Sequence, residues 1–330
     1  MNDYKGKRVL VTGAGGFIGR DLVRMLLEQG AHVTAFLRYN SHTAQEFEKL
    51  FGHPDLLKLV RGDLEDVDAV RQSVAGQDYV FHLGALVGIP YSYLHPVEVF
   101  NTNLMGTMNV LMAVKNSPEV KRLVVTSTSE VFGSAQYIPM DEKHPKHAQS
   151  PYAASKVGGD ALAQSFNLSF KTPVIILRPF NTFGPAQSAR AVIPSIIIQA
   201  LTKKTLKLGN TDTTRDFTYV SDTARGFLRA GLSGDDVLGH EVNLGTGIEI
   251  KISDIVQKVS KLTGVKLEVE QDEKRVRPTT SEVSRLCSNP AKAAAMLGWK
   301  PEVDFDRGLG LTLEWFKKNI SAYNPEEYAL

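Results

Sequence analysis

A tyrosine and a lysine four residues apart, Tyr152 and Lys156, have the residue types and the spacing best suited to catalysis. Of the 10 tyrosines in the chain, only Tyr152 has a lysine at this distance. Pro151 suits the first position of a helix and Ser150 can cap it, so the two side chains should share one helical face. An ammonium beside a phenol lowers the pKa of the phenol, which favours proton transfer near neutral pH. The alternative interpretation is a surface helix with an incidental Tyr–Lys pair.

A short polar stretch, Thr128-Ser129-Glu130, follows an apolar run over residues 122–127 that predicts a strand. The carboxyl ends of strands carry the chemistry in an open parallel sheet. Thr128 and Glu130 are two residues apart, so they would lie on the same side of an extended chain. We therefore expect a catalytic Glu130; the alternative is a strand-end carboxylate that pairs with a nearby cation.

Three glycines, Gly13, Gly16 and Gly19, stand three residues apart after the apolar run over residues 9–11. A helical pattern of apolar residues follows them and stops at Gly30. This strand, glycine turn and helix predict a dinucleotide site, because glycines let the backbone approach a pyrophosphate at a helix N-terminus. The residues that open the helix, Phe17 and Ile18, are included in the expected site.

The second predicted strand, over residues 32–37, is followed by Arg38. In NAD-binding proteins an acidic residue at this point binds the ribose 2′-hydroxyl, whereas a guanidinium favours a 2′-phosphate. Arg38 therefore favours NADP over NAD, unless it simply points into solvent. Further cofactor contacts are expected in the loops after the next two strands and on the helical pattern over 97–114: Asp63, Leu64, Leu83, Ala85 and Asn103. Asp63 could accept a hydrogen bond from the adenine amino group or merely cap a turn.

Strands and helices alternate over about the first 180 residues, which predicts a doubly wound parallel sheet of the Rossmann type. We expect a dinucleotide-binding domain over residues 1–180, with return segments near 220–245. A smaller α/β substrate domain, a lid over residues 181–330, would follow, with helices over 252–262 and 290–297.

The composition is that of a globular protein, with 42% hydrophobic and 22% charged residues among 330. A formal net charge of +2 gives no case for a nucleic-acid partner. Cys287 is the only cysteine and the histidines lack metal-ligand spacing, so no metal site is expected. No signal peptide or membrane-spanning stretch is evident, which favours a cytoplasmic protein.

Together these motifs resemble the extended short-chain dehydrogenase/reductases, in the group of nucleotide-sugar epimerases and dehydratases. Further stretches carry the resemblance: Gly62-Asp63-Leu64, Arg178-Pro179-Phe180-Asn181, the run from Arg215 to Asp222, and Leu297-Gly298-Trp299-Lys300-Pro301. The resemblance implies that Tyr152 takes the proton of the sugar 4-hydroxyl while C4 gives hydride to the nicotinamide. Lys156 would lower the pKa of the tyrosine and hold the ribose, and Thr128 would bind the same hydroxyl.

Glu130 matches the glutamate that removes the C5 proton in the 4,6-dehydratases of this family. Ser129 stands where the dTDP-glucose enzymes have an aspartate acid, a version similar to that of GDP-mannose 4,6-dehydratases and shared with UDP-glucuronate decarboxylases. The resemblance implies a nucleotide-sugar substrate and a homodimer. It places Asn181 against the nucleotide sugar and Arg215 and Arg277 near the diphosphate. Arg190 is a further candidate there, because guanidinium groups match phosphate oxygens.

Three stretches resemble most closely the 4,6-dehydratases that act on GDP- or UDP-N-acetylglucosamine in making legionaminic acid: residues 89–93, 277–283 and 324–328. A 4-epimerase is the alternative, since it needs Tyr152, Lys156 and Thr128 but not Glu130 as a base. A UDP-glucuronate-type decarboxylase is a weaker one. A cofactor-sensing regulatory protein on the same fold is the alternative of another class.

Overall fold

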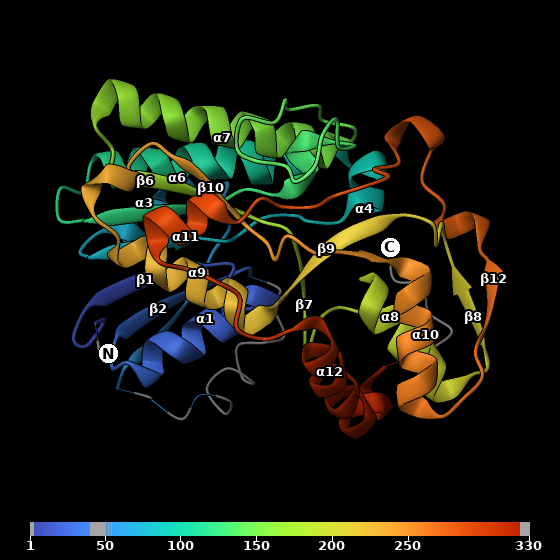
Figure 1. Ribbon diagram of the computed structural model, residues 1–330. Helices are drawn as coiled ribbons and strands as arrows, with labels where there is room; N and C mark the ends of the chain where they lie inside the picture. Colours follow the sequence, from blue (N-terminus) through green and yellow to red (C-terminus); the bar gives the residue numbers. More distant parts are fainter. Residues whose placement is uncertain (1–2, 40–50, 52, 54, 324–330) are drawn as a thin grey trace.

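A seven-stranded sheet forms the centre of the computed structural model, which describes residues 3–39, 51, 53 and 55–323 (Figure 1). The strand order is β10-β6-β5-β4-β1-β2-β3, and every neighbouring pair is parallel. The strands are β1 (Arg8–Thr12), β2 (His32–Leu37), β3 (Leu57–Arg61), β4 (Tyr79–His82), β5 (Arg122–Thr126), β6 (Val174–Pro179) and β10 (Glu241–Leu244). The predicted doubly wound parallel sheet is confirmed.

Helices cover both faces of this sheet, because alternate residues of each strand point to opposite sides. Val9 and Val11 of β1 join the core beneath α1 (Phe17–Glu28) and α9 (Val220–Leu232). Leu10, between them, joins the core beneath α3 (Val67–Val74), α6 (Gly106–Lys115) and α7 (Pro151–Phe170). The strand β1 is therefore buried on both sides.

The expected helix over 97–114 is built from several pieces. The segment α4 (Ile89–Leu94) precedes α5 (Pro96–Phe100), a π-helical turn η1 (Asn101–Met105) and then α6. Short 3-10 helices occur at Ser129–Phe132, Asp235–Val237, Glu273–Arg275, Thr279–Ser281 and Ile320–Ala322.

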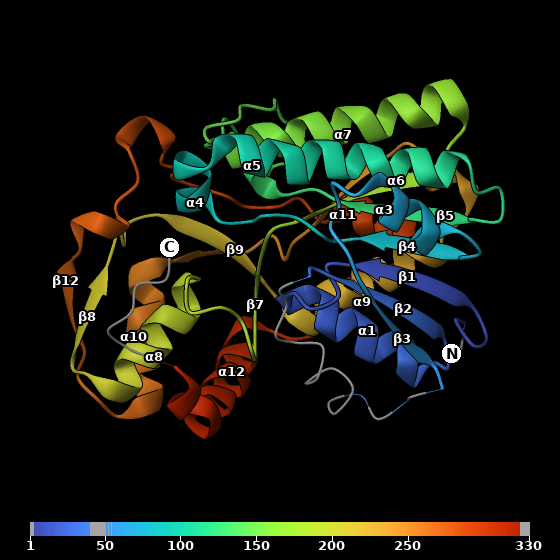
Figure 2. The same ribbon diagram turned by 180° about the vertical axis from the view of Figure 1, so that it is seen from behind.

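A smaller unit with its own core follows the first, on the other side of β9 in Figures 1 and 2. Its helices are α8 (Val192–Thr202), α10 (Ile252–Thr263) and α12 (Phe305–Asn319). One mixed sheet joins β7 (Asn181–Phe183), β9 (Thr214–Tyr219) and β11 (Glu249–Lys251), and a second pairs β8 (Thr205–Leu208) with β12 (Glu268–Gln271). This confirms the smaller C-terminal α/β region.

The helix α11 (Ala291–Leu297) does not belong to that smaller unit, so the prediction of a lid helix over 290–297 is wrong. It contacts α9 and β10, and Leu297 lies in the core beneath α1 and α9. The spacing of its apolar residues correctly predicted a helix, but it could not show which part of the protein the helix packs against. The chain therefore returns to the first unit again after the predicted return near 220–245.

Two buried aspartates connect the returning segments to the rest of the chain. Asp216 on β9 accepts hydrogen bonds from the backbone of Thr246, Gly247 and Ser288. Asp222 on α9 accepts both Glu302 N and Val303 N at 3.0 Å, just before α12 begins. Both carboxylates thus satisfy backbone amides of distant segments. Among the helices of the described residues, none is long and apolar enough to cross a membrane.

Candidate active site

The N-terminal half of α7 holds Tyr152 and Lys156 as the sequence predicts. Pro151 is the first helical residue, and the Ser150 side chain accepts a hydrogen bond from Ala153 N at 3.1 Å. Only 7% of Tyr152 and 6% of Lys156 is exposed, so this end of the helix is no surface feature. The Lys156 ammonium donates to Thr126 O, at the end of β5, at 3.0 Å. The predicted pair is therefore confirmed as a buried pair on one helix.

Thr128 and Glu130 are brought to Tyr152 by a turn and not by an extended chain. Thr128 caps the 3-10 helix Ser129–Phe132, and its hydroxyl accepts a hydrogen bond from Glu130 N at 3.3 Å. The expectation of an extended segment is wrong here because this cap closes the turn. The Thr128 side chain also hydrogen-bonds Tyr152, and the Glu130 charge acts on the same phenol. Ser129 is buried in the turn.

The pKa of Tyr152 in the protein alone shifts opposite to the direction expected from a neighbouring lysine. Burial raises the pKa well above its usual 10.0, the hydrogen bond with Thr128 offsets part of the shift, and the charges of Glu130 and Asp160 add to it. Burial also lowers the pKa of Lys156 from 10.5 to about 8, against the opposing effect of Asp160. Both groups are thus driven toward their neutral forms by removal from water.

Positive side chains surround Glu130. Arg277 Nη1 lies 3.7 Å from Glu130 Oε2, and Arg215 on β9 lies close enough for its charge to interact with both. Arg215 itself is 6% exposed and pairs with Glu282 at 3.6 Å. The structure therefore brings Arg215 and Arg277 together beside Glu130. The pairing that the sequence analysis held as an alternative for Glu130 is present.

The glycine turn forms a backbone cradle at the point where the strand order reverses, beside β1. Gly13 has φ +68°, and a side chain there would lie 2.6 Å from Gly84 N. A side chain on Gly19 would collide with Gly13 O. No side chain caps the N-terminus of α1, whose first turn starts at Phe17 and Ile18 and contains no acidic residue. This open helix end fits a pyrophosphate, so the chain has the features needed to hold a nicotinamide dinucleotide.

Arg38 at the end of β2 lies between two carboxylates. Its guanidinium is 3.1 Å from Glu98 Oε1 and 3.7 Å from Asp63 Oδ2. Asp63 also accepts a hydrogen bond from Glu65 N, as a turn-capping aspartate does. Arg38 is exposed, but it does not simply point into solvent.

The other residues predicted to bind the cofactor border this end of the sheet. Leu83 follows β4 and donates its amide to Thr12 O, while Leu64 is buried in the core beneath α6. Ala85 is half-buried in the loop after β4. Asn103 is buried. Its side-chain oxygen accepts a hydrogen bond from Leu86 N, and its side-chain nitrogen donates to Leu86 O and to Ser155 Oγ on α7. Asn103 therefore holds the loop after β4 against the helix of Tyr152.

The predicted substrate residues divide into two groups. Asn181 opens β7, next to Phe217 on β9, and its side-chain oxygen is buried without a hydrogen bond from the described residues. Arg190 is exposed in the turn before α8, where its charge acts on Tyr91 of α4. Arg190 therefore lies near α4, while Arg215 and Arg277 lie beside Glu130.

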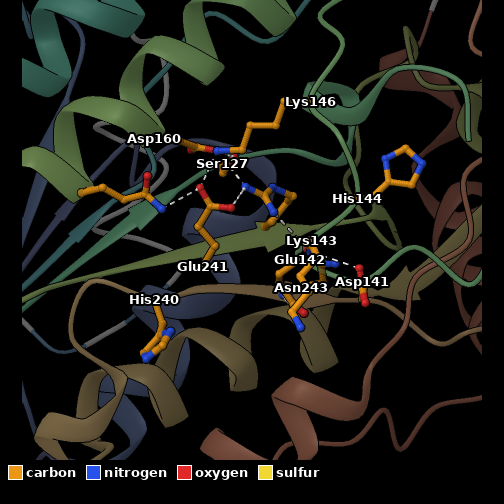
Figure 3. A network of polar contacts seen from close by, with 12 residues as sticks. Ser127, Asp141, Glu142, Lys143, His144, Lys146, Asp160, His240, Glu241 and Asn243 are labelled. Atoms are coloured by element: carbon orange, nitrogen blue, oxygen red, sulfur yellow. Dashed lines mark hydrogen bonds and ion pairs between the residues drawn. The ribbon is translucent and has the colours of Figure 1, made fainter. Parts of the chain in front are cut away.

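Two buried polar residues behind the site were missed by the sequence analysis. Asp160 stands one helical turn beyond Lys156, and its carboxylate accepts hydrogen bonds from Ser127, Lys146 and Arg178 (Figure 3). His82 on β4 contacts Thr12 at 2.8 Å, and burial with the charge of Lys156 lowers its pKa to about 3. The i+4 spacing from Lys156 was the available signal for Asp160. No group of side chains suited to a metal occurs in the described ranges.

Comparisons with known proteins agree with this geometry. Residues 10–312 match the family model described as GDP-mannose 4,6 dehydratase. Human dTDP-D-glucose 4,6-dehydratase is 29% identical, over 98% of this chain and 94% of the human protein. The solved epimerase Mth375 of Methanothermobacter thermautotrophicus is 29% identical with a TM-score of 0.88, over 97% of this chain and 95% of its own. DesIV, a dTDP-glucose 4,6-dehydratase from Streptomyces venezuelae solved with NAD and TYD bound, is 28% identical with a TM-score of 0.87, over 97% and 100%.

The Lys156→Met variant is predicted to have a higher free energy of unfolding than the wild type at pH 7. The lowering of the pKa of Lys156 from 10.5 to about 8 corresponds to a burial cost of roughly 3 kcal/mol. Loss of the hydrogen bond to Thr126 offsets about 1 kcal/mol, which leaves a gain of about 2 kcal/mol. Urea titrations measure this difference.

The sign of the pH dependence provides a second test of the same variant. Between about pH 8 and 10.5 the unfolded wild type binds more protons at Lys156 than the folded one, so its stability rises with pH. The difference between wild type and Lys156→Met should shrink over this window. Lys261→Met, at an exposed position of α10, should change little. A Lys156→Met variant less stable than the wild type at pH 7 would contradict the burial cost.

Proposed function

Because the chain belongs to the GDP-mannose 4,6 dehydratase family, we propose that it is a nucleotide-sugar 4,6-dehydratase. Such an enzyme converts a nucleoside-diphosphate hexose to its 4-keto-6-deoxy derivative with loss of one water. A bound nicotinamide dinucleotide would accept hydride from C4 and return it to C6, so that the cofactor is restored. The other steps move protons at the 4-hydroxyl and at C5, and side chains of this protein can transfer them.

Tyr152 is the proposed acid–base group at the 4-hydroxyl. Thr128, which hydrogen-bonds Tyr152 in the protein alone, would bind the same sugar oxygen and orient it. The Lys156 ammonium supplies a positive charge on the same helical face and would hold the ribose. Removal of a proton from the 4-hydroxyl leaves charge in a water-poor site, where a positioned cation is most effective.

Glu130 carries the distinction between a dehydratase and an epimerase. Oxidation at C4 acidifies the C5 proton, and a carboxylate close to Tyr152 can remove it and pass it to the C6 hydroxyl, which leaves as water. C5 takes up a proton again when hydride adds to C6. The supporting observation is that the Glu130 charge acts on the phenol of Tyr152 across the site. Arg277 and Arg215 place two positive charges next to this carboxylate.

The proposed substrate is GDP- or UDP-N-acetylglucosamine, as in the formation of legionaminic acid. Two of the three stretches behind this proposal lie together, because Tyr93 of α4 hydrogen-bonds Ser281 at 2.5 Å. Residues 89–93 and 277–283 can therefore form one wall for the sugar. The third stretch, residues 324–328, lies outside the described residues. Arg215 and Arg277 are the proposed diphosphate ligands and Asn181 a ligand of the nucleotide sugar, while Arg190, near Tyr91, is a further candidate.

A 4-epimerase is the second candidate, because one of the solved relatives is an epimerase with nearly the same fold. A decarboxylase stays a weaker alternative. Incubation with GDP- and UDP-linked mannose, glucose and N-acetylglucosamine in deuterated water separates these possibilities by mass spectrometry. A dehydratase gives loss of one water with one deuterium at C5, and an epimerase gives an isomer of unchanged mass. Turnover of none of them, with cofactor bound, would support the regulatory alternative.

Replacement of Glu130 by glutamine should block elimination and leave oxidation at C4 possible. We expect the dehydration rate to fall at least about 100-fold, because a general base contributes that much or more. Reduced nicotinamide should accumulate on mixing with substrate, which its absorbance reports. Glu249→Gln is the control, since Glu249 pairs with Arg285 and does not act on Tyr152. Full dehydratase turnover in Glu130→Gln would show that Glu130 is structural.

NADP is the proposed cofactor and Arg38 the residue that selects it, with NAD as the alternative that the solved relative DesIV contains. A 2′-phosphate would have to replace Glu98 or Asp63 as the partner of Arg38. Arg38→Ala should weaken NADP binding by roughly tenfold and leave NAD binding unchanged, because one charge-assisted contact is lost. Arg61→Ala, which removes an exposed arginine at the end of the neighbouring β3, is the control. Equal effects of Arg38→Ala on both cofactors would rule out NADP selection.

A homodimer is the proposed assembly, in the cytoplasm. The helix α7 contacts both α5 and α6, which follow one another along the chain, and the three lie on one side of the molecule in Figure 2. Exposed apolar side chains on them and on η1 between α5 and α6 are Val97, Phe100, Met105, Met112, Leu168 and Phe170. A two-fold contact would bury this surface on both copies at once.

Light scattering should therefore give twice the chain mass of 36.3 kDa. Met105→Glu should halve that mass, because it places a charge in the proposed contact. Ile248→Glu, at an exposed apolar residue elsewhere, should leave it unchanged. A wild-type chain of single mass would contradict the dimer.

A further inference from the structure

One carboxylate oxygen, Asp160 Oδ2, is the meeting point of three polar side chains behind the candidate active site. It accepts hydrogen bonds from Ser127 Oγ at 2.9 Å and from Arg178 Nη2 at 2.8 Å. Lys146 Nζ lies 3.3 Å from the same oxygen. Asp160 is 1% exposed, and Figure 3 shows Ser127 and Lys146 converging on it. The oxygen therefore joins three segments of the chain: the end of β5, the loop before α7, and β6.

The charges of this cluster balance. Arg178 Nη2 also donates to Glu241 Oε2 on β10 at 2.7 Å, and Lys146 pairs with the same glutamate. Two cations thus face two carboxylates, and Arg178 is fully buried. Buried ions are tolerated when each has partners with good geometry. The cluster is consequently a fixed point from which neighbouring residues can be held.

Two residues of the cluster are close along the chain to the proposed catalytic residues. Ser127 directly precedes Thr128, and Asp160 stands one turn beyond Lys156 on α7. The bond between Ser127 and Asp160 therefore fixes the strand end that carries Thr128 relative to the helix that carries Tyr152. We propose that Asp160 is a positioning residue, which holds Thr128 against Tyr152 and places its negative charge one helical turn from Lys156. The proposal rests on the proposed function only in assigning those three residues to the chemistry.

The surroundings of Lys156 explain the second part of this role. Its ammonium bonds Thr126 O on β5 and shares its helical face with Tyr152; His82 faces it from β4, and burial keeps His82 neutral. Asp160 is the carboxylate whose charge acts on Lys156. Without that charge, burial alone would lower the pKa of Lys156 below about 8.

Asp160→Asn tests the proposal, with Glu241→Gln as the matched control. Each variant removes one buried carboxylate from the same cluster, so both should lose stability, but only Asp160 contacts Ser127. In Asp160→Asn we expect kcat to fall about tenfold or more at constant KM. The alkaline limb of its pH–rate profile should shift by about one unit toward lower pH. Glu241→Gln should show neither change.

A direct titration of Lys156 separates this proposal from the proposed function. The 13C resonance of the lysine ε-carbon, assigned by its absence in Lys156→Met, reports the pKa without any turnover. A lower pKa in Asp160→Asn but not in Glu241→Gln supports the role, whatever the substrate. Equal titration in wild type and Asp160→Asn, or equal loss of kcat in both cluster variants, would overturn it.

Ser127→Ala keeps the proposal testable if Asp160→Asn does not fold. It removes one hydroxyl donor and leaves every charge of the cluster in place. We expect kcat to fall about tenfold while the titration of Lys156 stays where it is in the wild type. An unchanged kcat would show that the contact between Ser127 and Asp160 does not position Thr128.

Discussion

The buried ammonium of Lys156 is the constraint on which the rest of the site depends. A charge removed from water is costly unless it finds partners, and the chain supplies Thr126 O and the charge of Asp160. A buried Asp160 needs cations in turn, which Arg178 and Lys146 provide. Those two cations need a second carboxylate, Glu241 on the edge strand β10. One functional charge on α7 thus leads through a series of partners to the edge of the sheet.

The same principle operates where the smaller unit meets the first. Asp216 and Asp222 are buried, and each accepts several backbone amides from segments far away in the chain. An acceptor-only carboxylate suits such amides, because none of them has another partner in a strand or helix. Arg215, next to Asp216, is thereby held beside Glu130. Residues that resembled a family motif are thus largely structural, and they position the one arginine among them that faces the site.

Local features of the site could be predicted from the sequence, and non-local ones could not. The Ser150 cap, the Pro151 start and the glycine turn depend on neighbours within a few residues, and the structure has all three. The 3-10 turn after Thr128 and the packing of α11 depend on distant contacts. The direction of the pKa of Tyr152 was also beyond reach, because burial exceeds the effect of any single neighbour and only the fold shows burial.

Glu130 lies apart from the buried residues behind the site, Lys156 and the cluster around Asp160. This separation explains why both dehydratases and epimerases resemble this chain. In the proposed function, Tyr152, Thr128 and Lys156 serve oxidation at C4, a step common to both reactions, and the cluster around Asp160 supports that step. Glu130 lies outside that buried cluster, in a short turn capped by Thr128 and within reach of Arg277. A change at that turn would alter the reaction without disturbing the cluster around Asp160. The fold is therefore shared across the family, while in the proposed function the choice between elimination and epimerisation falls to the single carboxylate of Glu130.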